Sequence, residues 1–310
     1  MGGPNPGGVG RTFVVHGAGR LTDEDCPYLA EALTYAGGGG ARVRRRAAPR
    51  IGENGLGRDI RHVVGQCGPV LSNALAWCRA RLRRPRSGVR SPVADGPVVF
   101  TADFASLTQW VAGRSSAYPD GGPVNPGDNK LDYLVDDPSY SRGGVFRATR
   151  NPDGTWKTGL LTTEGSADGF MVRTGDVLEA RVRLPVGVGA WPAIWTWRDG
   201  GQEIDVFEYH PDNPDLLELT NHVKGGQFYF RDTVVAPDAW LDLRVRFGAR
   251  SVTWWVNGVR VFGDRAGVGR NWQAYLIVNL SVSAGRYHPR PPTDLAELSF
   301  EVSSLRIHRR

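Results

Sequence analysis

The stretch SVTWWVNGVRVF, Ser251–Phe262, decides the fold class. Two runs rich in Val, Trp and Phe flank the dipeptide Asn257-Gly258, and this dipeptide between β-forming runs predicts a two-residue β-hairpin. The preceding stretch WLDLRVRFG, Trp240–Gly248, alternates apolar and polar side chains, as a strand with one buried face does. Together these stretches predict consecutive antiparallel strands.

The β pattern continues on both sides of the hairpin. DVLEARVRLP, Asp176–Pro185, also alternates, and YLIVNLSVSA, Tyr275–Ala284, is an apolar run suited to a central strand. Many short strands with turns between them and almost no helix predict an all-β fold, a two-sheet antiparallel sandwich or jelly roll. The ten Trp residues and a hydrophobic fraction of 40% provide for a sizeable core, and no apolar run is long enough to span a membrane.

Residues 1–94 differ in composition from the rest of the chain. They hold 15 Arg, no Lys and 6 acidic residues, a net charge of +9, whereas residues 95–310 carry −3. Gly- and Arg-rich runs such as GGGGARVRRRAAPR predict irregular or disordered structure, while residues 22–37 and 72–84 have helical patterns. All three cysteines lie in this part: Cys26, Cys67 and Cys78. We therefore expect two domains with a boundary near residue 95.

The role of the basic segment is open at the level of sequence. A solvated or disordered tail is one interpretation, and binding to nucleic acid or another anionic surface is a second. A third is that the true start codon lies downstream. No secretory leader is visible, because Met1 is followed by Gly and Pro where a basic region and an apolar run should stand.

The stretch GQEIDVFEYH, Gly201–His210, carries three carboxylates, those of Glu203, Asp205 and Glu208. Strand alternation places Glu203 and Asp205 on one face but gives Glu208 the opposite parity. A β-bulge between Asp205 and Glu208 would correct the parity and direct all three into one groove. The Cα atoms of the two Glu residues would then lie roughly 13 Å apart. Their extended side chains would bring the carboxyl groups to roughly 5–6 Å, close to the separation in retaining glycosidases.

This geometry predicts double displacement, in which one Glu attacks the anomeric carbon and the other first protonates the leaving oxygen and then activates water. Asp205 would hydrogen-bond the nucleophile and help to keep a neighbouring pKa raised. The competing interpretations of the three carboxylates are an exposed acidic strand edge and a bound cation.

Aromatic and polar residues surround the carboxylates in the sequence. Trp191, Trp195 and Trp197 share one strand face and could act as platforms for sugar rings, or they could fill the core. Asn221 and His222 are candidate substrate ligands, and the His could bond a sugar hydroxyl or Asp205, or simply be structural. No cluster has the spacing of a catalytic metal site, so we expect neither a metal nor a cofactor.

Four stretches in order carry a resemblance: GAWPAIWTW, EIDVFEY, NHV and YLIVNLSVSAG. From about residue 98 to the end, the chain resembles the laminarinase and β-agarase branch of glycoside hydrolase family 16. The resemblance implies a β-jelly roll with a concave cleft and retaining hydrolysis inside polysaccharide chains. It also implies that Glu203 is the nucleophile, Asp205 the assisting acid and Glu208 the acid/base.

Two departures from the family pattern are visible. Trp197 lies six residues before Glu203 rather than five, and the Pro of the W-P-x-x-G-E pattern is missing, which puts in question the subsite that this Trp builds. Ser303 stands where many members have an Asp that helps to bind a structural Ca²⁺, so we expect that calcium site to be weakened or absent.

The sequence thus predicts a retaining endo-acting hydrolase of β-linked polysaccharide, most plausibly β-1,3-glucan or mixed-linkage β-glucan. A transglycosylase, a galactan hydrolase of the agar or carrageenan type, and a non-catalytic carbohydrate-binding module are the alternatives on the same scaffold. We expect a monomer whose partner is its polysaccharide, and a substrate of this class suggests an extracellular location.

Overall fold

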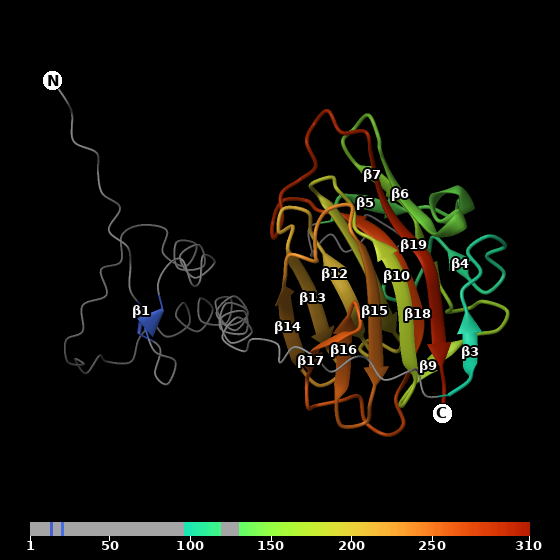
Figure 1. The fold of residues 1–310 in the computed structure, drawn as a ribbon. Coiled ribbons are helices and arrows are strands. Elements are labelled where there is room, and N and C mark those ends of the chain that lie inside the picture. The colour runs from blue at the N-terminus through green and yellow to red at the C-terminus, as the bar shows by residue number, and fades with distance from the viewer. Residues whose placement is uncertain (1–12, 15–19, 22–95, 119–129) are drawn as a thin grey trace, which may run out of the picture. The chain divides into compact units, whose positions relative to one another are not determined.

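The computed structural model describes residues 13–14, 20–21, 96–118 and 130–310 (Figure 1). The chain divides into two units, Met1–Arg84 and Pro85–Arg310. In the first unit the described residues form one antiparallel pair, β1 (Phe13–Val14) with β2 (Arg20–Leu21). The helices predicted over 22–37 and 72–84, the three cysteines and the predicted boundary residue lie outside the described residues.

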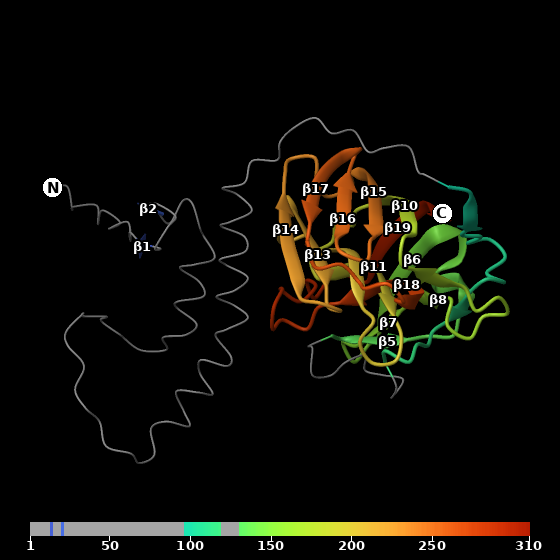
Figure 2. The same ribbon diagram turned by 90° about the horizontal axis from the view of Figure 1, so that it is seen from below.

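The second unit confirms the predicted all-β sandwich (Figure 2). One sheet has the strand order β17-β16-β15-β10-β19-β6-β7-β5, and β3 also pairs with β19. The other has the order β14-β13-β12-β11-β18-β8-β4, and β9 also pairs with β18. Of the strand pairs described, β5 with β7 is parallel and the rest are antiparallel. We call the second sheet the cavity sheet, because the candidate site lies on it.

The strands of the first sheet are β3 (Val98–Thr101), β5 (Asp132–Leu134), β6 (Val145–Arg150), β7 (Trp156–Thr158), β10 (Val177–Arg183), β15 (Trp240–Phe247), β16 (Val252–Val256), β17 (Val259–Gly263) and β19 (Glu297–His308). The strands of the cavity sheet are β4 (Val111–Ala112), β8 (Leu160–Thr162), β9 (Met171–Arg173), β11 (Ala190–Trp197), β12 (Ile204–Tyr209), β13 (Leu216–Asn221), β14 (Gly226–Arg231) and β18 (Gln273–Val282). Two 3₁₀ turns precede β6: η1 (Pro138–Tyr140) and η2 (Arg142–Gly144).

The predicted hairpin is confirmed as β16 and β17. Asn257 and Gly258 connect the two strands with φ angles of 48° and 77°. Both values lie in the left-handed region that a two-residue type I′ turn requires and that Asn and Gly adopt most readily. The strand predicted before the hairpin is β15, which pairs with both β16 and β10.

The core lies between the two sheets and is rich in aromatic side chains. Trp156, Phe146 and Phe300 from the first sheet are almost completely buried, as is Phe207 from the cavity sheet. The predicted central strand is β18, which pairs with β11 along its length and with β8 and β9 on its other side. Its residues from Leu276 to Val282 are all buried.

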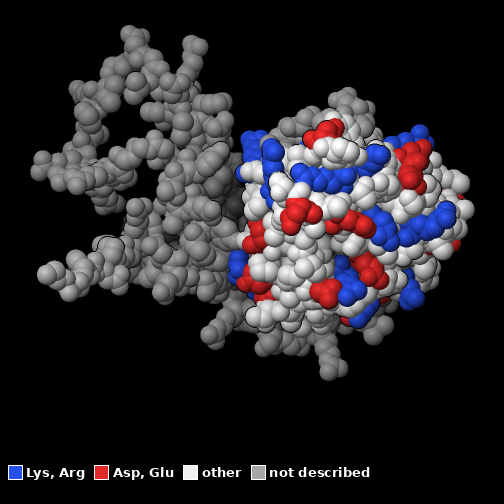
Figure 3. Space-filling view, turned by 90° about the horizontal axis from the view of Figure 1, so that it is seen from above, with Lys and Arg blue, Asp and Glu red and all other residues white. Residues whose placement is uncertain are grey.

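The outer surface of the first sheet is charged with both signs. Cross-strand ion pairs join Arg147 to Glu297 at 2.8 Å and Arg181 to Asp242 at 2.9 Å, and all four side chains are about half exposed. Figure 3 shows one face of the molecule on which basic and acidic side chains are interspersed. In the described part of the chain, neither 3₁₀ turn is long and apolar enough to cross a membrane, and no other helix is present there.

Candidate active site

The predicted β-bulge is present in β12. On the β11 side, Ile194 pairs with Phe207 and Trp195 pairs with Asp205, so Val206 is skipped. The pairing of β12 with β13 shifts register between Asp205 and Glu208 as well. Val206 and Phe207 both enter the core although they are consecutive. This double step returns Glu208 to the same face of the cavity sheet as Asp205.

A side chain from the opposite sheet braces the bulge. A bulge leaves part of the strand ladder unpaired, and a buried backbone group without a partner is costly. The indole nitrogen of Trp254, on β16, crosses the core and donates a 3.2 Å hydrogen bond to the carbonyl oxygen of Asp205. Trp254 is 1% exposed, so this bond is shielded from water. The core therefore supports the local irregularity that the three carboxylates need.

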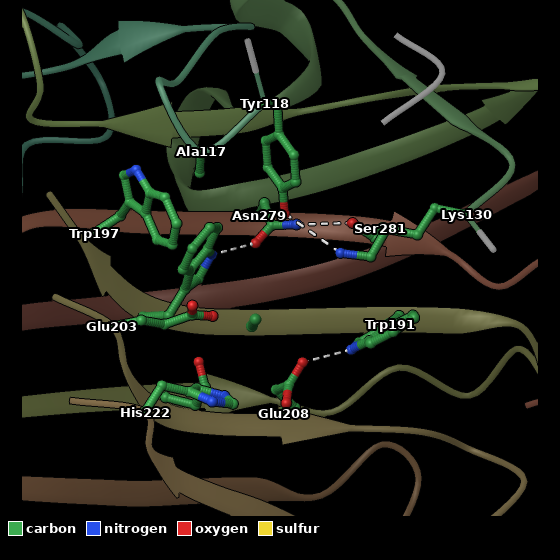
Figure 4. A pocket seen from close by; sticks show the side chains of 13 residues that line it. Ala117, Tyr118, Lys130, Trp191, Trp197, Glu203, Glu208, His222, Asn279 and Ser281 are labelled. Atoms are coloured by element: carbon green, nitrogen blue, oxygen red, sulfur yellow. Dashed lines mark hydrogen bonds and ion pairs between the residues drawn. The ribbon is translucent and has the colours of Figure 1, made fainter. Parts of the chain in front are cut away.

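The three carboxylates line one cavity of about 470 Å³ on the cavity sheet (Figure 4). The predicted face of β11 lines it too, with Trp191, Trp195 and Trp197. The remaining lining residues come from β11, β18, the end of β13 and the segments next to residues 119–129: Ala117, Tyr118, Lys130, Ala193, His222, Asn279 and Ser281. Flat aromatic walls beside a few polar groups suit a sugar chain, whose rings have apolar faces and polar rims.

The carboxylates of Glu208 and Asp205 have different hydrogen-bond partners. The indole nitrogen of Trp191 donates a 2.8 Å hydrogen bond to Oε1 of Glu208. The side chain of Asp205 is almost fully buried, and its Oδ2 lies 3.1 Å from Nε2 of His222. The backbone N–H of His222 also donates to the carbonyl oxygen of Glu203 at 3.1 Å. His222 is thereby held against the carboxylates by both its backbone and its ring.

The site raises the pKa values of Glu203, Glu208 and His222. Burial, followed by the negative charge of Asp205, raises the pKa of Glu203 to about 7 and that of Glu208 to about 7. The hydrogen bond to Asp205 is the main reason that the pKa of His222 rises to about 9. Near neutral pH the site can therefore hold a proton on one Glu while the other is ionised, which is the pairing that acid and nucleophile roles require.

Two polar residues of the cavity were missed because their strand reads as an apolar run. Asn279 and Ser281 on β18 are joined by a 2.9 Å hydrogen bond, and Oδ1 of Asn279 accepts from the indole nitrogen of Trp195 at 2.8 Å. Alternating polar residues inside YLIVNLSVSA were the available signal. Asn279 thus fixes the orientation of one aromatic wall of the cavity.

Two further residues, Tyr118 and Lys130, carry no sequence pattern that points to the site. The ammonium group of Lys130 donates to the phenol oxygen of Tyr118 at 3.3 Å. Its nitrogen also lies 4.5 Å from the ring centroid of Trp191. Both residues reach the cavity from segments that adjoin 119–129, and only the folded arrangement brings them to β11.

The structure does not bring Asn221 to the cavity. On β13, Asn221 has the opposite parity to Glu218, and its side chain is completely buried. Its amide nitrogen donates to Asp264 and to the carbonyl oxygen of Gly267, while its amide oxygen accepts from the backbone N–H of Lys224. Because its polar atoms are all used in joining β13 to the loop after β17, the expectation that Asn221 contacts substrate is corrected.

Two groups of described residues have donor atoms close enough to hold a metal ion. The first, Glu203 with Asp205 and His222, consists of the candidate catalytic residues themselves. The second is His210 with Asp212 and His288. There the two imidazole rings stack with centroids 3.4 Å apart and planes 6° apart, so their in-plane lone pairs do not converge on one point. The second group therefore lacks the convergent ligands of a preformed catalytic metal site.

The chain is similar to two curated β-glucanases. No protein-family model matches it. It is 27% identical over 236 residues to the endo-1,3-1,4-beta-glycanase EglC of Rhizobium meliloti, a match that covers 63% of this chain and 47% of that protein. It is 40% identical over 75 residues to a beta-glucanase of Rhodothermus marinus, covering 21% of this chain and 24% of that protein.

The solved structures share the fold. A variant of SCLam, described as a non-specific endo-beta-1,3(4)-glucanase from family GH16, matches with a TM-score of 0.58 and 17% identity, covering 73% of this chain and 99% of that one. The chain is thus similar in sequence to two curated glycan-degrading enzymes and similar in fold to a glucanase of glycoside hydrolase family 16. The match to SCLam concerns the fold, because its sequence identity is low. The chain spans about half of EglC and a quarter of the Rhodothermus protein.

Proposed function

We propose that this protein is a member of glycoside hydrolase family 16 and a retaining, endo-acting hydrolase of β-linked glucan. The observation that carries the proposal is the bulge of β12, which directs Glu203, Asp205 and Glu208 into one cavity walled by tryptophans. Three carboxylates on one strand face repel one another and cost stability, so a purely structural role would not favour them. The names of the two curated relatives, a beta-glycanase and a beta-glucanase, support the substrate class.

In the first step, ionised Glu203 attacks the anomeric carbon and protonated Glu208 gives its proton to the glycosidic oxygen. The glycosidic bond breaks, the leaving chain departs as an alcohol, and a covalent bond joins Glu203 to the sugar. In the second step, Glu208 takes a proton from water, whose oxygen attacks the same carbon and releases Glu203. The configuration is retained, and the sum of the steps consumes one water molecule.

Asp205 assists without forming a bond to the sugar. Its negative charge opposes ionisation of both Glu residues, and the bond to His222 keeps Asp205 in place. His222, as the imidazolium, balances part of the negative charge once Glu203 is ionised. These contacts support the assignment of Asp205 as the assisting acid rather than as a nucleophile.

The choice among β-1,3-glucan, mixed-linkage glucan and galactan depends on the cavity walls. Trp195 and Trp197 stand with ring centroids 6.2 Å apart at an interplanar angle of 66°, which forms a bent wall rather than a flat strip. A bent wall suits a curved chain such as β-1,3-glucan better than a straight one. This supports β-1,3-glucan or mixed-linkage glucan as the substrate.

The test is a reducing-sugar assay of the full chain on laminarin, lichenan, agarose, carrageenan and xyloglucan. Activity on laminarin or lichenan that is absent from Glu203→Gln would support the proposal. The exposed Glu297 offers a matched control, since Glu297→Gln should retain activity. NMR of the first product would detect the anomer, and an inverted anomer would rule out double displacement. Binding to a polymer without turnover would favour a carbohydrate-binding module instead.

A further inference from the structure

Lys130 is distinguished from the chain's two other lysines by its position. Lys157 and Lys224 are exposed, whereas Lys130 is half-buried in the wall of the cavity that holds Glu208. A cation inside a site with several carboxylates commonly pairs with one of them directly. Within the described residues, Lys130 forms no such ion pair, and its one hydrogen bond goes to the phenol of Tyr118. The carboxylates of Asp132 and Glu208 balance its charge through space, without a direct contact to either.

The ammonium group of Lys130 faces the indole of Trp191. Its nitrogen lies 4.5 Å from the ring centroid of Trp191 and 5.4 Å from that of Tyr118. The same indole donates its N–H to Oε1 of Glu208 at 2.8 Å. Figure 4 shows Lys130, Trp191 and Glu208 along one side of the cavity. The three side chains thus form a continuous series of contacts that ends at the acid/base.

The contact of Lys130 with Trp191 has a chemical consequence for Glu208. A cation against an indole face attracts the π electrons, which makes the N–H of the ring a stronger donor. Because that N–H occupies Oε1 of Glu208, the transferable proton is carried by Oε2. The stronger hydrogen bond that Oε1 accepts also stabilises the carboxylate that remains after proton transfer. Glu208 therefore becomes a stronger acid.

We propose that Lys130 is a positioning residue that acts through the indole of Trp191 to orient and strengthen the general acid Glu208. This inference rests on the proposed glycosidase function. Lys130 need not contact the reacting atoms, because its influence reaches Glu208 through the N–H of Trp191. The bond to Tyr118 holds the ammonium group in place.

Several other charged groups face Glu208. Asp205 lies on its own strand and Glu203 directly precedes that strand, while Glu218 pairs with it from β13 and His222 follows β13. Burial and the negative charge of Asp205 raise the pKa of Glu208, whereas Lys130 and His222 lower it. The imidazole of His222 is bonded to Asp205, whereas Lys130 is the cation that contacts the hydrogen-bond donor of Glu208.

The test compares two leaving groups, and so separates a loss of acid catalysis from a general loss of folding or binding. We would measure kcat/KM of the full chain and of Lys130→Met on laminarin, and on a 2,4-dinitrophenyl β-oligoglucoside whose phenolate departs without a proton. We expect Lys130→Met to lower the value on the polysaccharide about tenfold, because it weakens a general acid whose full contribution is roughly 10²–10⁴-fold. The value on the activated substrate should change less than twofold.

Three variants complete the test. Lys130→Arg, which keeps the cation, should recover most of the activity on laminarin. Lys157→Met, at an exposed position, should behave as the wild type on both substrates. Trp191→Phe should reproduce the loss selective for laminarin, and adding Lys130→Met to it should cause little further loss, because the two residues act in series. If Lys130→Met does not fold, Trp191→Phe and Lys130→Arg still provide the comparison.

The outcomes that would overturn the inference are distinct from failure of the proposed function. Equal losses on the two substrates, no loss at all, or additive effects of Lys130→Met and Trp191→Phe would each reject the role of Lys130 while leaving the glycosidase function intact. A wild-type chain that is inactive on both substrates would reject the glycosidase function, and the role of Lys130 with it.

Discussion

The two sheets treat charge in opposite ways. On the first sheet, Arg147 faces Glu297 and Arg181 faces Asp242 across neighbouring strands, with all four side chains about half exposed. On the cavity sheet, Glu203, Asp205 and Glu208 bring three negative charges into one partly buried site. The ion pair described there joins Asp205 to His222. The first arrangement costs little and contributes little. The second is costly in free energy, and the raised pKa values of its Glu residues reflect that cost.

This difference indicates that the carboxylate cluster of the cavity sheet lowers the stability of the fold in favour of a chemical role. A buried like-charged cluster is maintained only where the surrounding structure supports it, and here the support is the bulge with its bond from Trp254. The exposed ion pairs follow the ordinary pattern of opposite charges across strands. Substitutions in the two sheets should therefore differ in kind as well as in size.

The largest expected effect is the loss of turnover when either Glu is neutralised. Glu203→Gln would remove the proposed nucleophile and Glu208→Gln the proposed transferable proton, so each should lower kcat on the best glucan about a thousandfold or more. Circular dichroism should show an unchanged fold, because both side chains face the cavity. Near wild-type activity in either variant would contradict the assigned roles. The buried like charges of the cavity sheet would then have no catalytic explanation.

Asp205→Asn should have a smaller effect on activity and a specific effect on His222. We expect kcat to fall roughly tenfold, since Asp205 assists without forming a bond to the sugar. The hydrogen bond to Asp205 raises the pKa of His222 to about 9, so loss of the negative charge should lower it. NMR titration of the His222 ring measures this directly. An unchanged pKa would mean that another group holds the imidazolium.

The stability of Glu203→Gln should depend on pH. Burial and Asp205 raise the pKa of Glu203 to about 7 in the folded protein. A carboxyl whose pKa is raised by folding takes up a proton on folding, so its contribution to stability falls as pH rises from the unfolded to the folded pKa. Glu203→Gln should therefore raise the free energy of unfolding by about 1–2 kcal/mol at pH 8.

At pH 4 the same substitution should have little effect, because the carboxyl is then largely protonated in both states. Urea unfolding at the two pH values measures the difference. Glu297→Gln is the matched control, since this glutamate is exposed and pairs with Arg147 at the surface. A stability gain that is equal at both pH values would contradict the charge-burial argument.

The smallest effect is expected at the outer surface of the first sheet. Arg181→Met should change the free energy of unfolding by less than about 0.5 kcal/mol, because its pair with Asp242 is exposed and screened. Chemical unfolding at low and high salt would test this. A loss well above 1 kcal/mol would show that the first sheet also depends on specific charges, and the contrast between sheets would weaken.

Local sequence rules were enough for the fold class and the centre of the site. The alternation of side chains, the Asn257-Gly258 turn and the parity of the three carboxylates are properties of short segments. They depend on backbone geometry that each strand carries with it, so the hairpin and the bulge could be predicted without knowing any neighbour. The shared face of the tryptophans on β11 follows from the same rule.

Contacts between distant segments were beyond such rules. Asn221 could not be excluded from the site without knowing that Asp264 and Gly267 reach its side chain. Lys130 and Tyr118 could not be included without knowing that their segments lie against β11. Strand order and register determine which residues become neighbours. That order depends on the free energy of packing the whole core, to which many distant residues contribute. The tertiary structure therefore determines which residues contact the three carboxylates, whereas their common direction follows from their spacing in the sequence.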